Sequence, residues 1–357
     1  MSFKAAVSWT GAAMALGAAA LFGFSAPLAK LLIDQGVGPV LLAGLLYLSS
    51  GLGLTVAWLA RKPLGLPAEA PVRLADLPWL ALTVVAGGIA GPVLLMIGLA
   101  GTPAAQGALL LNVEGLATMA IAWIVFRENL DRRILVGAAA ILAGAALLSW
   151  QGQGGAVGLP ALAIVGACLC WAVDNNLTRK ISGSDPVQLG AIKNVTAGVV
   201  ILAATLVHGA ALPSPAVSLG ATTIGLFGYG LSLVLFIQAL RRLGTARTSA
   251  YFSVAPFLGA ALALALFGEA ISLQLVAAAL LMGVGVYLHL SERHAHTHVH
   301  EALEHEHRHR HDEHHRHEHC PSDPPGEPHV HRHRHEPMTH SHPHYPDLHH
   351  RHGHSKA

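Results

Sequence analysis

Two groups of residues in this sequence have chemistry beyond packing. The first is a histidine-rich C-terminal segment: 23 of the 25 histidines lie between His294 and His354. Imidazole binds borderline transition metals, and alternating His-X-His brings several imidazoles together in an extended chain. The second group consists of ionisable residues inside long apolar segments, Glu114, Asp174 and Lys193. The sequence therefore has two separate candidate sites.

The histidine-rich tail, residues 291–357, is predicted to bind zinc, nickel, cobalt or copper at many weak, exchangeable sites. The positions singled out as metal ligands are His305, His307, His309, His311, His331, His333, His335, His342 and His344. No spacing in the tail matches a defined structural zinc site. Because the tail has no apolar periodicity and contains several prolines, we predict that it is disordered without metal.

Three roles are open for this tail. The favoured one is metal buffering or sensing linked to the membrane part of the chain. A pH switch is the second, since protonation of histidines near a pKa of about 6.5 would make the tail cationic and draw it to anionic lipid. The third is a nonessential metal-binding appendage.

The rest of the sequence is typical of a polytopic, all-α membrane protein. Hydrophobic residues make up 53% of the chain and charged residues only 12%, about half the charged share of soluble proteins. Apolar segments of about 20 residues, the length that spans a bilayer as a helix, recur along the chain. We predict ten transmembrane helices at residues 11–33, 38–60, 77–99, 103–125, 134–149, 158–177, 187–207, 219–239, 246–267 and 273–290. The apolar run at the start is too long for a cleaved signal peptide, so we expect it to be the first helix.

An internal repeat divides this membrane part into residues 1–150 and residues 151–290. A shift of 141 positions aligns Phe126 with Phe267 and Glu128 with Glu269, without a gap. The fourth and fifth predicted helices therefore recur as the ninth and tenth. Five helices per half is an odd number, so the two halves must cross the membrane in opposite orientations.

The placement of basic residues supports the inverted orientation. Arg132 and Arg133 follow the fourth predicted helix, but the aligned positions after the ninth are uncharged. Conversely, Arg241 and Arg242 follow the eighth helix, and the link after the third has no charge. Cytoplasmic loops are enriched in lysine and arginine. We therefore predict a multi-pass protein of the cell membrane, the inner membrane in a bacterium, with both termini and the tail in the cytoplasm.

The sequence resembles the EamA-type drug/metabolite transporters. The resemblance rests on the two five-helix halves, the small-residue run FGFSAP at 22–27, and the Phe-X-Glu pattern ending at Glu128 and Glu269. It covers residues 5–290. It implies ten helices around a central cavity that opens alternately to each side and moves small organic solutes without ATP hydrolysis by the chain. The ninth predicted helix keeps the family's proline as Pro256. The aligned position in the fourth predicted helix is Gly115, which is preceded by Glu114.

Charged groups in hydrocarbon cost about 2.5 to 3.5 kcal/mol on insertion scales, so they usually face a cavity or a partner. Glu114, near the middle of the fourth predicted helix, is expected to be a substrate or proton site; the alternative is a structural salt bridge to Lys193. For Asp174, a cavity role and a paired charge near the interface, under Arg179 and Lys180, are both open. For Lys193, the favoured interpretation is a side chain that reaches the membrane interface.

The remaining site candidates are uncharged. Asn112, Asn175 and Asn176 are predicted to line the cavity, although amides also join helices. Tyr251 is predicted to shape the site or to pack. Pro256 breaks the ninth helix, either at the binding site or as a kink for packing.

Three functions from different classes fit these features. The favoured one is a secondary transporter of small organic metabolites, with export favoured and the tail as a regulatory metal-binding accessory. The second is a divalent nickel, cobalt or zinc transporter that uses the tail as an ion buffer or sensor. The histidines in or next to the predicted helices are His208 and His289, both near helix ends, which argues against a histidine-lined path. The third is a membrane-tethered metal buffer that no longer transports.

The expected partners follow from these functions. They are a small-molecule substrate, the lipid bilayer and transition-metal ions, with a homodimer possible through faces of small residues. We expect no nucleic-acid partner and no required cofactor. No nucleophile–base set and no nucleotide-binding loop is found, so an enzyme is not expected.

Overall fold

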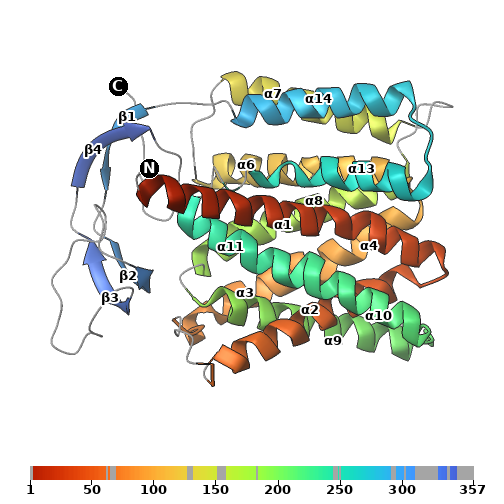
Figure 1. The fold of residues 1–357 in the computed structure, drawn as a ribbon, viewed down its shortest axis with the longest axis horizontal. Coiled ribbons are helices and arrows are strands. Elements are labelled where there is room, and N and C mark those ends of the chain that lie inside the picture. Colours follow the sequence, from red (N-terminus) through yellow and green to blue (C-terminus); the bar gives the residue numbers. More distant parts are fainter. Residues whose placement is uncertain are drawn as a thin grey trace.

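Long helices lie side by side in the part of the chain up to residue 290, and short strands lie beside the end of the bundle where α1 begins (Figure 1). The computed structural model describes residues 3–61, 63–64, 70–126, 132–150, 158–181, 184–243, 248, 251–290, 295–300, 303–309, 329–335 and 338–343.

The first half of the chain contains α1 (Phe3–Asp34), α2 (Pro39–Arg61), η1 (Leu74–Asp76), α3 (Leu77–Thr83), η2 (Val84–Ala90), α4 (Gly91–Ala100), α5 (Ala104–Leu110), α6 (Asn112–Phe126) and α7 (Arg132–Ser149). The second half contains α8 (Leu159–Ile181), α9 (Pro186–Val207), α10 (Pro215–Ile224), η3 (Gly225–Leu231), α11 (Ser232–Leu243), α13 (Ala255–Phe267) and α14 (Leu273–Leu290). The tail contains β1 (Ala295–His300), β2 (Leu303–His309), β3 (His329–His335) and β4 (Met338–Pro343).

The membrane-spanning character predicted from the sequence is confirmed for most of these segments. Within the described residues, 7 helical segments are long and apolar enough to cross a membrane. Three apolar helices are shorter: Leu135–Ser149, Ala255–Phe267 and Leu273–Leu288. They fall on the fifth, ninth and tenth predicted helices, so the count of ten spans stays a prediction.

The two halves share an irregularity at the same register. In α3–η2–α4 and in α10–η3–α11, seven residues form wider π-helical turns, starting at Val84 and at Gly225. These starts are 141 positions apart, which is the shift of the sequence repeat. Such π-bulges are uncommon and occur often at functional sites.

The packing between the halves is reciprocal. The first helix of one half, α1, packs on α11 and α13 of the other, and α8 packs on α4 and α6. The second helices pair as α2 with α9, and the last helices as α7 with α14. Each half therefore completes the core of the other.

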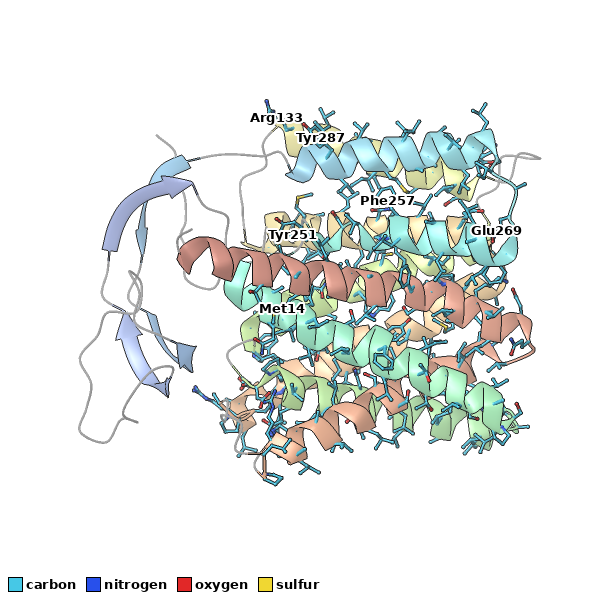
Figure 2. The ribbon with its side chains drawn as sticks, in the orientation of Figure 1. Met14, Arg133, Tyr251, Phe257, Glu269 and Tyr287 are labelled. Carbon is cyan, nitrogen blue, oxygen red and sulfur yellow. The ribbon has the colours of Figure 1, made fainter. Side chains whose placement is uncertain are left out.

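Arg133 and Glu269 lie at opposite ends of the bundle (Figure 2). The end where α7 begins, near Arg133, is called the basic end; α2 and α8 also end there (Figure 1). Arg61, the last residue of α2, donates from Nη1 to the Asp185 carboxylate at 2.6 Å. Glu269 lies at the opposite end, which we call the Glu269 end. The start of α7 and the end of α11 are both at the basic end (Figure 1), as the placement of basic residues predicts. Which end faces the cytoplasm remains a prediction.

The prediction of a disordered tail is not confirmed in its described segments. There, β1 pairs with β4 and β2 pairs with β3, both antiparallel. The physical reason is the His-X-His alternation, whose period of two residues matches that of a strand. The tail residues between and beyond these strands, including His311 and His344, lie outside the described residues.

Glycine allows α2 and α9 to approach closely. A Cβ at Gly198 would lie 2.6 Å from the Leu48 Cα, and a Cβ at Gly51 would lie 2.8 Å from the Asn194 carbonyl carbon. In contrast, a Cβ at Gly283 in α14 would have its nearest neighbour, the Phe257 ring, at 4.0 Å.

We predict that Gly198→Ala destabilises the bundle by about 1 to 3 kcal/mol, because the new methyl group forces α2 and α9 apart. The matched change Gly283→Ala is expected to be neutral or slightly stabilising, since alanine favours a helix over glycine. Thermal unfolding of the purified variants, followed by tryptophan fluorescence, compares them. Equal unfolding temperatures would contradict this account of the α2–α9 contact.

Candidate functional site

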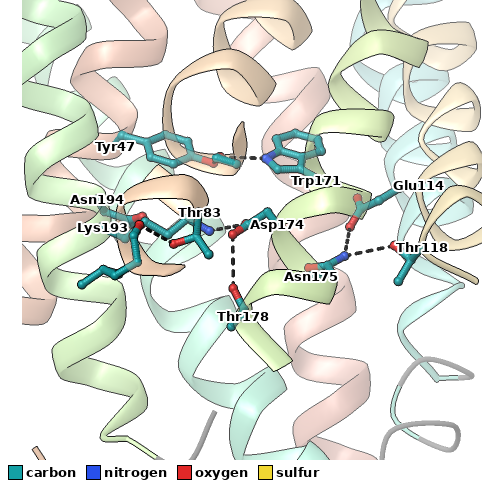
Figure 3. Close-up of polar contacts among 12 residues, drawn as sticks. Tyr47, Thr83, Glu114, Thr118, Trp171, Asp174, Asn175, Thr178, Lys193 and Asn194 are labelled. Atoms are coloured by element: carbon teal, nitrogen blue, oxygen red, sulfur yellow. Dashed lines mark hydrogen bonds and ion pairs between the residues drawn. The ribbon is translucent and has the colours of Figure 1, made fainter. Parts of the chain in front are cut away.

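Polar side chains from α2, α3, α6, α8 and α9 gather within the bundle (Figure 3). They form two groups, each held together by its own hydrogen bonds. On one side of α8 lies an ion pair, and on the other lies Glu114 with its amide partner.

The ion pair joins Lys193 of α9 to Asp174 of α8. Thr178 Oγ1, one turn further along α8, donates to the second carboxylate oxygen of Asp174 at 3.2 Å. The side chains are only 7% exposed for Asp174 and 16% for Lys193. This geometry differs from the interpretation that Lys193 reaches the interface. The basic neighbour Lys180 is also not the partner of Asp174, because its Nζ lies 3.8 Å above the Trp79 ring.

The π-helical turn η2 provides the wall against which Asp174 packs. A Cβ at Gly87 would collide with the Asp174 carboxylate, so glycine is required for this approach. The Gly87 carbonyl has no helical donor: the Gly91 N–H bonds Ala86, and the next residue, Pro92, has no N–H. A free buried carbonyl is costly, and side chains from two other helices satisfy it.

These two side chains are Tyr47 of α2 and Trp171 of α8. The Tyr47 hydroxyl and the Trp171 Nε1 each donate to the Gly87 carbonyl at 3.0 Å. Both residues are buried, at 5% and 6% exposure. Because their rings are fixed by these bonds, they form a rigid side of the site.

Glu114 has a different environment from Asp174. Its Oε1 accepts from Asn175 Nδ2 at 3.1 Å, and the same amide lies 3.3 Å from Thr118 Oγ1. Within the described part of the chain, Glu114 forms no ion pair. The alternative of a salt bridge between Glu114 and Lys193 is therefore not what the structure shows.

The surroundings of Glu114 are also open. Glu114 is partly exposed and Asn175 is exposed. Among the described residues, no atom beyond Gly115's chain neighbours and its own helix backbone lies within 4 Å of the position that a Cβ at Gly115 would occupy. The repeat aligns Gly115 with Pro256. Gly115 therefore leaves free the space that a proline ring would occupy at this position. A carboxylate with an amide partner and free space beside it is able to take up a ligand or a proton.

Within the bundle, six aromatic side chains form a cluster that includes the two partners of the Gly87 carbonyl: Phe22, Tyr47, Trp171, Tyr229, Phe236 and Phe252. The Phe22 ring is central, with its centroid 6.0 Å from Trp171, 6.0 Å from Tyr229 and 5.4 Å from Phe252. Trp171 precedes Asn175 by one helical turn, so these two side chains lie on the same face of α8. Sequence analysis missed Tyr47 and Tyr229, because single aromatic residues on membrane helices usually pack and nothing in their spacing marks them.

The other predicted site residues lie apart from Glu114 or serve packing. Asn176 joins α8 to α6 by donating to the Thr118 carbonyl at 3.1 Å and to Ala172 at 2.8 Å. Asn112 is buried and donates to the Leu109 carbonyl at 2.9 Å. Both amides fit the interpretation that they hold helices together, since the Asn112 amide also lies 3.7 Å from the Met282 sulfur of α14.

Tyr251 and Pro256 also differ from a simple cavity role. The Tyr251 side chain is 39% exposed and lies toward the basic end (Figure 2). Pro256 lies in the first turn of α13, where a missing N–H breaks no helical bond. It therefore starts this helix rather than interrupting it.

The described side chains contain no group of three or more histidine, cysteine, aspartate or glutamate residues placed to hold a metal. His208 bonds its own helix, with Nδ1 2.7 Å from the Ala204 carbonyl. The side chains of the tail histidines lie outside the described residues, so their role as metal ligands stays a prediction.

Comparison with known proteins agrees with this architecture. Residues 9–150 and residues 158–291 each match the EamA-like transporter family. An uncharacterized transporter of Methanothermobacter thermautotrophicus is 27% identical over 271 residues, covering 71% of this chain and 78% of that protein. The uncharacterized inner membrane transporter YedA of Escherichia coli K12 is 27% identical over 240 residues, covering 66% of this chain and 76% of its own length.

A crystal structure described only as that of a protein superposes with a TM-score of 0.54 at 20% identity, covering 76% of this chain and 95% of that chain, and supports the fold alone. The family matches cover more than half of the chain. The resemblance inferred from the sequence is therefore confirmed, and the protein is a multi-pass membrane transporter, a class that is not normally enzymatic. This chain belongs to the EamA-like transporter family.

Proposed function

We propose that this chain is a secondary transporter that exports small organic metabolites by alternating access, with substrate or a coupling proton binding at Glu114. The observation that carries the proposal is the contrast between two acids in one bundle. Asp174 is buried and paired with Lys193, whereas Glu114 is partly exposed, accepts a hydrogen bond from the Asn175 amide and has open space beside it at Gly115, with no ion pair among the described residues.

The charge of the site favours a substrate that carries an ammonium group. Among the described residues, Glu114 and Asp174 bring two negative charges to the site and Lys193 brings one positive charge. The site therefore has an excess of one negative charge when all three are ionised. The aromatic cluster supplies flat apolar surfaces and ring faces that attract organic cations. A small amine-bearing metabolite suits both features.

Glu114→Gln is expected to abolish transport while leaving the fold intact, because glutamine keeps the hydrogen bond to Asn175 but loses the charge. Untargeted comparison of metabolites released by cells that express either form measures this effect. Glu114→Asp, which keeps the charge on a shorter stem, is expected to retain part of the export. Unchanged export by Glu114→Gln would contradict the assignment.

Asp174→Asn provides the contrasting result. It leaves the buried Lys193 without its counter-charge, which costs about 3 to 5 kcal/mol in buried ion pairs. We expect a clear drop in thermal stability, which Glu114→Gln does not share. If both variants lost stability equally, the distinction between a structural and a functional acid would be wrong.

We further propose that the tail binds transition metal and regulates the carrier. What supports this is the strand register, which places His305 opposite His333 and His307 opposite His331. Residues directly opposite each other in an antiparallel pair share a face, and alternate residues share the same face. The residues between these histidines pair Glu306 with Arg332. The histidine pairs are thus at register positions of one face, and the charge pairs at positions of the other.

The alternative function is a divalent-metal transporter that draws on this tail. An experiment can distinguish metal binding that needs histidines on one face of the paired strands from binding that depends only on the number of histidines. We expect the double change His307→Arg with Arg308→His, which keeps the composition, to weaken zinc or nickel binding by the full-length protein about tenfold, since it removes one histidine from the shared face. Titration calorimetry checks this. Equal affinity of the exchanged chain would show that only histidine number matters.

A chain that stops after Ser291 distinguishes the two functions. If the tail regulates a metabolite carrier, truncation is expected to remove the metal dependence of export and to leave export itself. If the protein carries metal, cellular metal content is expected to change with Glu114→Gln as well as with truncation. A metal phenotype in Glu114→Gln would therefore favour the alternative over the metabolite carrier.

A further inference from the structure

Glu269 forms a bond between the two halves that the transport site does not use. Its Oε1 accepts from the Ala104 N–H at 2.6 Å, and its Oε2 accepts from the Ala105 N–H at 3.1 Å. Gly268, in a left-handed conformation with φ 58°, ends α13 immediately before it. The acid of the second half thus binds the start of α5 in the first half, at the Glu269 end (Figure 2).

The local sequence explains why α5 needs this acceptor. The first N–H groups of a helix have no partner within the helix, and a side chain of the preceding residue usually accepts one of them. Here that residue is Pro103, which forms no side-chain cap. The acceptor for both N–H groups is supplied by the other half of the chain. Separation of the halves at this end therefore breaks two charge-assisted bonds.

The same contact closes the Glu269 end of the bundle. The α5 helix packs on α13 and α1, and Ala104, Ala105 and Ala108 are 0%, 0% and 1% exposed. A Cβ at Gly259 of α13 would lie 3.1 Å from the Ala108 Cβ, so the helices touch at this point. Further along the same span, α6 packs on α8 and α7 within the described residues. The seam between this span and α13 is thus tight where Glu269 binds.

Space lies beside the start of α5. A hollow of about 400 Å³ is lined by Pro103, Gln106 and Gln274, among others. Water can therefore replace the carboxylate at the two N–H groups if α5 moves away, which makes the bond reversible rather than permanent.

The acid also belongs to the repeat. The shift of 141 positions aligns Glu269 with Glu128, although the residues before them differ, Gly268 against Arg127. Glu128 lies outside the described residues. An acid kept at the same register in both halves points to a role that the repeat shares, beyond capping one helix.

We propose that Glu269 is a positioning residue of the transport cycle, whose carboxylate holds α5 against α13 in the state closed at the Glu269 end and releases it when that end opens. The proposal rests on the alternating access proposed above. It predicts that weakening this bond moves the protein from one state to the other, with opposite changes in accessibility at the two ends.

The test uses the full chain with its cysteines replaced by Cys168→Ala, Cys170→Ala and Cys320→Ser. One reporter, Ala108→Cys, lies in the seam, and a second, placed singly, is Asn175→Cys beside Glu114. A membrane-impermeant maleimide is applied from the Glu269 end to the first reporter and from the basic end to the second. In Glu269→Gln, labelling of the first is expected to rise about tenfold, since bonds to charged acceptors are lost, and labelling of the second is expected to fall.

Asp34→Asn is the matched control. Asp34 is an acid that pairs with Lys30 within the same helix, at 2.7 Å and at the same end of the bundle, so its neutralisation removes a charge without breaking a bond between halves. It is expected to leave both labelling rates unchanged.

Each other outcome overturns the proposal. Unchanged labelling at Ala108→Cys would mean that Glu269 only caps α5, and a rise at both reporters would mean that the bundle has loosened without changing state. The labelling is independent of any substrate. If Glu114→Gln leaves export intact while the two reporters respond in opposite directions, the substrate site is wrong and the role of Glu269 stands.

Discussion

Inside an apolar helical bundle, each polar group must find its partner within the protein, and this constraint organises the structure. The Gly87 carbonyl shows it most clearly. The π-helical turn and Pro92 leave this oxygen without a helical donor, and Tyr47 and Trp171 are drawn to it from two other helices. The same glycine leaves room for Asp174, whose charge Lys193 balances. One backbone irregularity thereby places an ion pair and two aromatic rings beside the candidate site.

Glu114 stands out because its hydrogen-bond partner is an amide, whereas Asp174 is balanced by a cation. Its neighbours are an amide, a threonine and open space, and no cation balances it within the described residues. A charge in hydrocarbon without a partner costs free energy, so a bundle that retains one needs a ligand, a proton or water to offset that cost. This is the physical basis for assigning transport to Glu114 and structure to Asp174.

The membrane-spanning character and the family can be predicted from the amino-acid sequence, because apolar length and a repeated pattern are read from residue types alone. The placement of Arg132 and Arg241 also predicts that the start of α7 and the end of α11 lie at the same end of the bundle, as the structure shows. The ion-pair and hydrogen-bond partners of the site residues cannot be predicted in this way, because they depend on which sides of the helices pack against each other. A simple charge argument allows Lys193 to pair with Glu114. In the structure, Lys193 pairs with Asp174, and Glu114 accepts a hydrogen bond from the Asn175 amide. The Glu269 bond is visible in the sequence only as a repeated acid, since its acceptor role requires the fold.

The central claim is that Glu114 faces an accessible space in the membrane and that Asp174 is closed off by its ion pair. Modification by a water-soluble carbodiimide with an added amine, followed by mass spectrometry of the peptides, tests it directly on the intact protein in membranes. The account predicts that the peptide containing Glu114 gains the mass of the amine and that Asp174 stays unmodified. Modification of Asp174 with Glu114 left untouched would contradict it.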